Sequence, residues 1–566
     1  MNSQSSKTDT VLAVLIWCTL VAVAIVMRPL LPIDETRYIT VAWEMFQSGD
    51  YWVPTKNGEL YSHKPPFYFW LMNLGWAIFG VSEAWARLVA PLFGLATLFV
   101  TVRLAHNLWP EASDELRQSR AWMATLMMLT GLYWTVFSTM TMFDMMVTFA
   151  AVLAILGYIK AWRGFVSGQG YWKGILIAGL GIGIGGLAKG PAILVHTLPL
   201  ALFAPLWGPA LTAKDNDQGW GKWYAGVLVS VLVGAGITLA WAIPAAIIGG
   251  EEYRNAIFIK QSADRMVKSF AHRRPFYWFL WVVPVMLLPW TLWPRLWRAI
   301  GGRKAWTQKT GLRGAWADGG VRALLIWSAA AFVIFSAISG KQPHYLLPIF
   351  PALALFAAYV LTSDKTDKTA GVYHRVPALV LGTLAFVLMA GLLAKDMIEP
   401  MLKKPLPAWV AVAEPLWLLP VVIMALAAAW TKISGPRAEV RLIAALAASL
   451  VMMMHMAAAP AFSLAYDLEP AAQRIKIWHD EGRPVLYVGK YHGEFQFLGR
   501  LEKPIENVHR LEDAVAWAAL HPKGIIIATK RESEIPTTTR PFHVQPYRGK
   551  VLVMWLAKGF KLPPKL

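Results

Sequence analysis

The sequence contains little charge and almost no cysteine. Only 16% of its 566 residues are charged, whereas soluble globular proteins average about 25%. The single cysteine, Cys18, excludes a disulfide framework and a cysteine-based metal site. Neither G-x-G-x-x-G nor a P-loop follows a predicted strand, so no nucleotide substrate is indicated. The sequence also lacks the internal repeat typical of inverted-repeat transporters.

Apolar and aromatic residues dominate instead. Hydrophobic residues make up 56% of the chain, and 29 residues are tryptophan. This composition predicts an integral membrane protein with aromatic side chains at both membrane interfaces. The first apolar run, 11–27, has no small-residue cleavage site behind it, which predicts a retained span rather than a signal peptide.

Thirteen apolar runs are long enough to cross roughly 30 Å of hydrocarbon. The predicted spans are 11–29, 84–106, 119–137, 143–161, 172–187, 190–206, 222–248, 276–298, 321–338, 343–362, 376–395, 408–430 and 438–460. The apolar run 65–80 is left out, because it has only 16 residues, begins with two prolines and is rich in aromatic residues. It fits a helix lying in the membrane interface. The alternative is a short fourteenth span.

Charge distribution favours thirteen spans. With the N-terminus in the cytoplasm, the basic loops 299–320 and 431–437 lie inside, as the positive-inside rule requires. A fourteenth span would reverse every later loop. The net charge of +20 lies in such short loops, so it does not indicate nucleic-acid binding, which needs one basic soluble face.

Two domains follow from this pattern. Residues 1–460 form a transmembrane domain with an outer loop at 33–83, and residues 461–566 form a small periplasmic α/β domain. Its predicted elements are strands at 483–489, 524–529 and 551–556 and a helix at 511–520. We therefore expect a polytopic α-helical membrane protein with an α/β domain on its outer side.

Charged and polar groups gather at the predicted outer ends of the spans, where charge is costly unless it is paired or faces water. These residues are Asp34, Glu35, Arg37, Tyr61, His63, Lys64, Glu83, Arg87, Asp144, Lys189, Arg265, His272, Lys341, His344 and Tyr345. Several have plainer interpretations. Asp34 and Asp144 could be helix caps, and Lys189 an ordinary loop charge. The basic loop 249–275 suggests anion binding, but it also carries acids and could simply be solvated.

Carboxylates and cations together suit a reaction on a sugar phosphate. Lysine and arginine hold the phosphate, while a carboxylate orients an acceptor or stabilises positive charge on the sugar carbon. We expect Asp34, Glu35 and Asp144 in the catalytic role and the other residues named above in substrate binding. No His-x-x-x-His or Asp-x-Asp spacing is present among these outer-face residues, so a divalent metal is possible but unsupported.

Five motifs resemble those of the polyprenyl-phosphate-dependent glycosyltransferases with the GT-C fold, which include the protein O-mannosyltransferases. They are Asp34-Glu35, His63-Lys64-Pro65-Pro66, Glu83 to Arg87-Leu88, Asp144, and Leu187-Ala188-Lys189-Gly190-Pro191. Within this group the chain looks most like the bacterial lipid A aminoarabinose transferases (ArnT). The resemblance extends over essentially the whole chain.

The resemblance implies transfer of 4-amino-4-deoxy-L-arabinose from undecaprenyl phosphate to lipid A phosphates, at the periplasmic face of the inner membrane. This modification confers resistance to polymyxin and cationic peptides. Asp34 matches the family's catalytic acid and Asp144 its second buried acid, while Lys64 and Tyr345 match positions near the carrier phosphate. His63 departs from the pattern, because enterobacterial members have glutamate there.

Alternative functions remain open from the sequence. Another sugar or a protein acceptor would suit the same motifs. A phosphate acceptor is already anionic and needs no strong base, unlike a protein hydroxyl. A lipid-linked sugar flippase would place charged residues along the bilayer midplane, which this sequence does not do. A membrane scaffold would leave the acidic pair, Asp144 and the outer basic loop unexplained.

Overall fold

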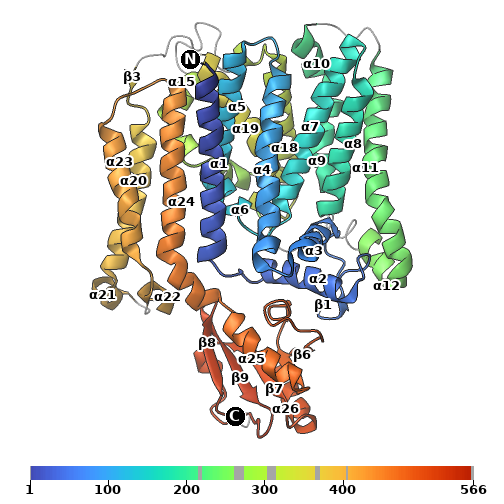
Figure 1. The fold of residues 1–566 in the computed structure, drawn as a ribbon, viewed down its shortest axis with the longest axis vertical. Helices are drawn as coiled ribbons and strands as arrows, with labels where there is room; N and C mark the ends of the chain where they lie inside the picture. Colours follow the sequence, from blue (N-terminus) through green and yellow to red (C-terminus); the bar gives the residue numbers. More distant parts are fainter. Residues whose placement is uncertain are drawn as a thin grey trace.

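Long apolar helices form the body of the protein, and a small sheet domain lies at one end of them (Figure 1). The computed structural model describes residues 2–213, 219–259, 273–301, 314–363, 370–402 and 406–562. The N-terminus lies at the opposite end of the bundle from the C-terminal domain (Figure 1). We call the end that carries the domain and residues 33–83 the site end, and the other the opposite end.

Nine helices in the described part of the chain are long and apolar enough to cross a membrane, and one bent pair makes a possible tenth. They are α1 (Asn2–Met27), α4 (Glu83–Leu108), α7 (Asp144–Ser167), α8 (Tyr171–Lys189), α11 (Trp220–Ile248), α18 (Gly319–Ala337), α19 (Phe350–Ser363) with η3 (Pro343–Ile349), α20 (Arg375–Leu393) and α24 (Pro436–Tyr466). The bent pair is α9 (Ala192–Leu202) and α10 (Ala204–Thr212), with 57° between them. The chain is therefore a membrane protein.

The three other predicted spans are broken helices, so the count of thirteen is not confirmed. They fall on α5 (Asp114–Leu129) with α6 (Leu132–Ser138), on α14 (Trp278–Met286) with η2 (Trp290–Leu292) and α15 (Pro294–Gly301), and on α22 (Ala408–Ala411) with η5 (Pro415–Leu418) and α23 (Leu419–Trp430). Gly131 separates α5 from α6, and Pro289 and Pro294 interrupt the second group. Proline cannot donate the backbone hydrogen bond that a continuous helix needs.

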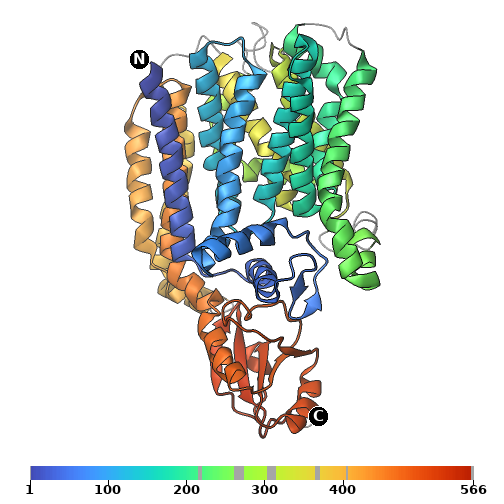
Figure 2. The ribbon, with the colours of Figure 1, turned by 45° about the vertical axis from the view of Figure 1, so that its right-hand side comes forward.

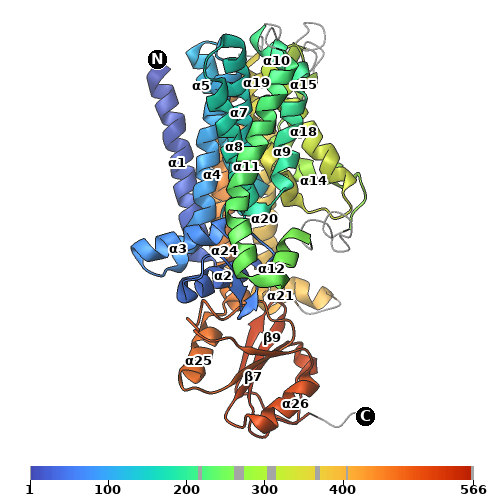
Figure 3. The ribbon, with the colours of Figure 1, turned by 90° about the vertical axis from the view of Figure 1, so that its right-hand side faces the viewer.

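The segment between α1 and α4 lies across the site end of the bundle. It contains α2 (Asp34–Ser48), the hairpin β1 (Thr55–Lys56) and β2 (Glu59–Leu60), and α3 (Phe67–Phe79). In Figures 2 and 3, α3 runs across the long axis of the bundle. Leu74, Ile78 and Phe79 are exposed on it. This is the arrangement expected of a helix lying in a membrane interface.

The C-terminal domain is a five-stranded mixed sheet in the order β6-β5-β7-β9-β8. Its elements are α25 (Glu469–Asp480), β5 (Val485–Val488), β6 (Glu506–Val508), α26 (Leu511–Leu520), β7 (Ile525–Lys530), η6 (Glu532–Glu534), β8 (His543–Tyr547) and β9 (Lys550–Leu556). The three predicted strands and the helix at 511–520 are confirmed, whereas β6 and β8 were not predicted. The predicted boundary at 460/461 falls inside α24.

Short elements complete the chain: α12 (Gly250–Asn255), β3 (Ala370–Gly371), α21 (Lys395–Ile398), η4 (Glu399–Met401) and β4 (Ile433–Ser434).

Side chains of the 33–83 segment fasten it to the C-terminal domain. The hydroxyl of Thr40 donates to the carbonyl of Gly493 at 2.6 Å, and the indole of Trp43 donates to that of Leu501 at 3.0 Å. Asn57 likewise donates to the carbonyl of Ile505 at 2.8 Å. The domain is therefore docked directly on α2 and the hairpin.

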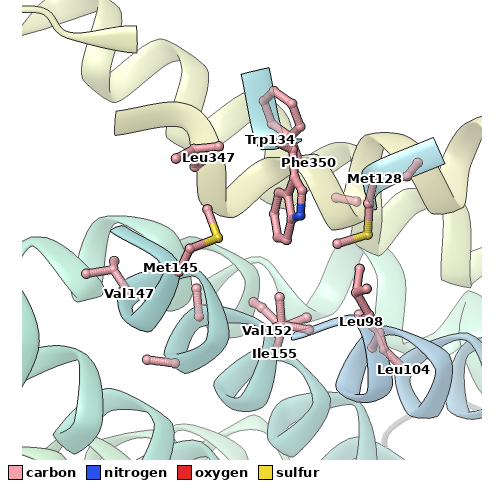
Figure 4. Packing of buried hydrophobic residues seen from close by; sticks show 14 of the residues in the cluster. Leu98, Leu104, Met128, Trp134, Met145, Val147, Val152, Ile155, Leu347 and Phe350 are labelled. Atoms are coloured by element: carbon pink, nitrogen blue, oxygen red, sulfur yellow. The ribbon is translucent and has the colours of Figure 1, made fainter. Parts of the chain in front are cut away.

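Helix α7 runs through the middle of the bundle. Met145, Val152 and Ile155 on it are buried among residues from α4, α6 and α19 (Figure 4). Its closest neighbour is α8, where a Cβ placed on Gly174 would lie 2.3 Å from the backbone of Ala161. Small residues at such contacts let membrane helices pack backbone to backbone. The two helices that carry Asp144 and Lys189 are thus held rigidly together.

Buried ion pairs join helices at the opposite end. Both carboxylate oxygens of Glu439 are bonded, one by the Trp293 indole at 2.7 Å and the other by the Arg295 guanidinium at 2.8 Å. The buried Asp9 on α1 pairs with Arg437 and Arg441 on α24. Each of these carboxylates has cationic partners from another part of the bundle, which satisfies the buried charge.

Candidate functional site

Asp144 is the centre of a charged cluster at the site end. It is the first residue of α7, and its side chain is only 6% exposed. The ammonium of Lys189, at the last position of α8, lies 2.7 Å from Oδ1. The imidazole of His344 in η3 lies 4.0 Å from the same oxygen. The structure therefore brings together three residues predicted from separate outer turns.

Two more predicted residues lie beside this cluster. The Lys64 ammonium is 5.9 Å from the centre of the Phe143 ring and interacts electrostatically with Asp144. The ring of Tyr345 lies 5.3 Å from the Lys189 ammonium. Two lysines and a histidine thus surround one buried carboxylate, an arrangement able to hold a phosphate.

Asp34 lies at the first turn of α2, where it pairs with Arg37. The Asp34 side chain is 47% exposed, so it is open to solvent. Tyr38, the next residue after Arg37, packs its ring 5.0 Å from that of Phe143, which precedes Asp144. Burial raises the pKa of Tyr38 well above its usual range, so its hydroxyl stays neutral. The first turns of α2 therefore pack against the residue that precedes the buried acid.

Glu35 has a structural position. Its buried carboxylate accepts hydrogen bonds from Arg28 at 2.6 Å, from the Leu31 backbone at 2.7 Å and from the Thr141 backbone at 2.7 Å. Burial opposes its ionisation, but the charge and hydrogen bonds of Arg28 outweigh this and lower the pKa of Glu35. These bonds join the end of α1 to the segment before α7, which is a structural role for Glu35 that its expected catalytic role did not include.

Arg87 also has a structural position. Its guanidinium donates to the carbonyls of Ile25 and Ala24 at the end of α1, at 3.0 and 2.7 Å, and pairs with Glu83 at 2.9 Å. These bonds satisfy carbonyls that a helix end leaves free. Arg87, paired with Glu83, therefore holds the end of α1. The substrate-binding role expected of both residues stays a prediction.

The other predicted residues divide into three groups. The Lys341 ammonium donates to the carbonyls of Arg274, at 3.1 Å, and Ile338, so it fastens a loop instead of facing a ligand. Tyr61 is buried and its ring packs against that of Phe69. The centre of the His63 ring lies 5.5 Å from the centre of the Tyr61 ring. Arg265 and His272 lie outside the described residues.

No group of three or more histidine, cysteine, aspartate or glutamate side chains suited to a metal ion occurs among the described residues.

Several residues of the site were missed from the sequence. Arg28, Tyr68, Phe143 and His196 all contact or lie near the charged cluster. His196 carried a usable signal, because it is a lone titratable residue inside the apolar run of α9. The tyrosine and the phenylalanine carried none, since aromatic residues are frequent throughout the chain.

Comparison with known proteins gives three findings. Residues 7–248 match the family model described as dolichyl-phosphate-mannose-protein mannosyltransferase. The chain is 28% identical over 387 residues to the undecaprenyl phosphate-alpha-4-amino-4-deoxy-L-arabinose arabinosyl transferase of Edwardsiella ictaluri (strain 93-146), covering 66% of this chain and 65% of that protein. It is 30% identical over 403 residues to transferase 1 of the same name from Sodalis glossinidius (strain morsitans), covering 66% and 65%. The chain thus matches just under two thirds of these relatives' length.

The fold can be compared over the full length. The crystal structure of ArnT from Cupriavidus metallidurans bound to undecaprenyl phosphate superposes with a TM-score of 0.70 at 21% identity, covering 98% of this chain and 99% of that one. The chain therefore has the GT-C fold with a small C-terminal sheet domain, as the sequence predicted. Its fold is therefore similar to that of ArnT.

Proposed function

We propose that this protein transfers 4-amino-4-deoxy-L-arabinose from undecaprenyl phosphate to phosphate groups of lipid A, and so confers resistance to polymyxin and cationic peptides. The observation that carries the proposal is the buried Asp144 carboxylate with Lys189, His344 and Lys64 around it, at the same end of the bundle as the accessible Asp34. The names of the similar transferases support the choice of donor and sugar.

In this reaction the bond between the sugar carbon and the carrier phosphate breaks, and a new bond forms from that carbon to an oxygen of the lipid A phosphate. Lys64 and Lys189 hold the carrier phosphate as its negative charge grows. Asp34 stabilises positive charge on the sugar carbon or orients the acceptor. No strong base is needed, because the acceptor phosphate is already ionised near neutral pH.

We also propose that the site end faces the periplasm from the inner membrane. Arg437 and Arg441 at the opposite end support this orientation by the positive-inside rule. A reporter fused after Leu566 is expected to give a periplasmic signal. A cytoplasmic signal would reverse the orientation and remove the donor and acceptor lipids from the proposed site.

Mass spectrometry of lipid A from cells with and without the protein tests the transfer directly. We expect lipid A carrying the amino sugar only when the protein is present, and about 10²-fold slower transfer with the Asp34→Asn variant at equal expression. The same assay on purified protein, with and without EDTA, measures any need for a divalent ion. Lipid A that stays unmodified when folded wild-type protein and the donor are both present would contradict the proposal.

A related transferase function is favoured by one finding, the match of residues 7–248 to a protein mannosyltransferase model. Such an enzyme would use a hydroxyl of a protein as its acceptor. Supplying the purified protein with polyprenyl-phosphate mannose and a serine-rich peptide distinguishes the two. Glycosylated peptide without modified lipid A would favour this alternative.

A further inference from the structure

Four buried polar atoms around Asp144 have no hydrogen-bond partner in the described part of the chain. They are the hydroxyls of Tyr68, Tyr133 and Thr141 and Nδ1 of His196. Buried polar groups in folded proteins nearly always have a partner. Four such atoms near one buried carboxylate therefore indicate that something else bonds to them.

These groups come from different elements and meet near the same carboxylate. Tyr68 is on α3, Tyr133 on α6, and His196 on α9, while Thr141 lies three residues before Asp144. The charge of Asp144 acts electrostatically on the Tyr68 and Tyr133 hydroxyls and on the His196 imidazole. Helix packing alone does not need polar atoms at these positions, because phenylalanine would fill the space of either tyrosine.

Aromatic contacts hold the three rings in place. The Tyr68 ring lies 4.7 Å from that of Phe143, the Tyr133 ring stacks on Phe137 at 4.4 Å, and the His196 ring lies 5.1 Å from that of Phe335. Rings fixed in this way present their polar atoms without further loss of side-chain freedom. Such preorganisation favours recognition of a ligand.

The chemistry of this group differs from that of the neighbouring lysines. The buried hydroxyls are uncharged and can both donate and accept a hydrogen bond, so they suit the hydroxyl and amino groups of a sugar. A site built to hydrogen-bond a substrate hydroxyl also rejects substrates that lack it. Phosphate recognition and sugar recognition would then use different residues on two sides of Asp144.

We propose that the polar groups of Tyr68, Tyr133, Thr141 and His196 bind the sugar of the carrier-linked donor. This inference rests on the proposed transferase function, and it assigns sugar selection to groups separate from Lys64 and Lys189. Tyr68 and Tyr133 make the sharpest test, since substitution by phenylalanine removes only the hydroxyl.

The experiment compares two ligands on the same purified variants. One is undecaprenyl phosphate, and the other is undecaprenyl phosphate carrying 4-amino-4-deoxy-L-arabinose. For Tyr68→Phe and Tyr133→Phe we expect affinity for the sugar-bearing lipid to fall about 5- to 10-fold each, the usual value of one neutral hydrogen bond. Affinity for undecaprenyl phosphate itself should stay within about twofold of wild type.

Tyr158→Phe is the matched control. Tyr158 is also buried on α7, but its hydroxyl is 2.9 Å from that of Ser230, away from the charged cluster. This variant should bind both lipids as the wild type does. It separates the loss of a buried hydroxyl in general from the loss of one at the site.

Three results would overturn the inference. Equal loss of affinity for both lipids would assign the tyrosines a structural role. Unchanged affinity for both would mean that ordered water alone satisfies these hydroxyls. A loss in Tyr158→Phe as large as in the other two would also contradict it. If the wild-type protein binds neither lipid, the proposed transferase function fails instead.

Discussion

The two ends of the bundle bury carboxylates in different ways. At the opposite end, Glu439 is bonded through both oxygens to Trp293 and Arg295. At the site end, Asp144 has Lys189 beside it but is surrounded by buried polar atoms that lack partners, such as the hydroxyls of Tyr68 and Tyr133. A buried carboxylate bonded through both oxygens stabilises one arrangement of helices. The unpartnered hydroxyls near Asp144 are the groups proposed above to bind the donor sugar.

The same contrast separates two adjacent residues. Glu35 has every bond supplied by the protein, whereas Asp34 has one partner, Arg37, and is half exposed. Residues next to each other on a helix point about 100° apart, since a turn contains 3.6 residues. The first therefore faces solvent while the second faces the helices. Chemical similarity alone cannot tell which carboxylate is available for a reaction.

The largest effect is expected from Asp144→Asn. Removing this carboxylate should lower the transfer rate about 10³-fold, the upper range for losing one electrostatic group in a site. Transfer is measured by mass spectrometry of modified lipid A in a purified assay. The matched variant at the opposite end, Glu439→Gln, should lower the free energy of unfolding by about 3 kcal/mol while the folded fraction keeps its specific activity. Equal activity losses in the two would erase the distinction between the ends.

Asp34→Asn and Glu35→Gln should separate activity from stability in the same way. We expect Asp34→Asn to reduce transfer about 10²-fold. Its melting temperature should stay close to that of wild type, because an exposed ion pair contributes about 1 kcal/mol or less. Glu35→Gln should melt at a lower temperature, since it weakens a buried bidentate bond with Arg28. A Glu35→Gln variant with normal stability and no activity would restore Glu35 to a catalytic role.

Lys64→Ala should weaken binding of the carrier phosphate. A hydrogen bond to a charged group contributes about 1.5–3 kcal/mol, which corresponds to a loss of affinity of about 10- to 100-fold. Binding of undecaprenyl phosphate by the purified variant measures this. Arg117, which pairs with Asp114 at the start of α5, provides a control, and Arg117→Ala should bind the lipid normally. Unchanged affinity in Lys64→Ala would exclude the residue as a phosphate ligand.

The smallest effect concerns pH and the C-terminal domain. Burial raises the pKa of Glu494. A carboxyl with a raised folded pKa contributes stability below its unfolded pKa, and this contribution is lost as the pH rises through the folded value. At neutral pH the ionised Glu494 therefore costs stability, so Glu494→Gln should melt slightly higher. The difference should vanish below about pH 4. A lower melting temperature for the variant at pH 7 would show that the carboxylate is stabilising.

Much of the helical body could be predicted, because lipid requires long apolar runs and each such run became a helix or a broken helix. The meeting of Asp144, Lys189 and His344 also followed from the order of the spans, which places their turns at one end. Continuity of each span was harder to judge. Breaks at Gly131 and Pro289 depend on how neighbouring helices pack, and hydropathy does not report this.

The parts that were missed have physical causes as well. Strand β6 has only three residues, and β8 is an edge strand containing Pro546, so neither shows a clear alternating pattern. Edge strands tolerate proline because one side of their backbone is unpaired. The structural roles of Arg87 and Lys341 depend on backbone carbonyls, which carry no sequence signal. The position of Arg87 and Lys341 at a membrane edge suggested a function for both. In the structure, Arg87 bonds the carbonyls at the end of α1 and Lys341 bonds loop carbonyls.

Helix α24 has a mechanical consequence. It is a single helix of 31 residues whose first turns carry Glu439, Arg437 and Arg441 at the opposite end, and it leads into the C-terminal domain. Pro460 lies within its last two turns, the kind of position at which helices bend. A tilt of the domain would therefore bend this helix at Pro460 and also break the bonds of Thr40, Trp43 and Asn57 to the domain, so the helix and the docked segment limit its movement together.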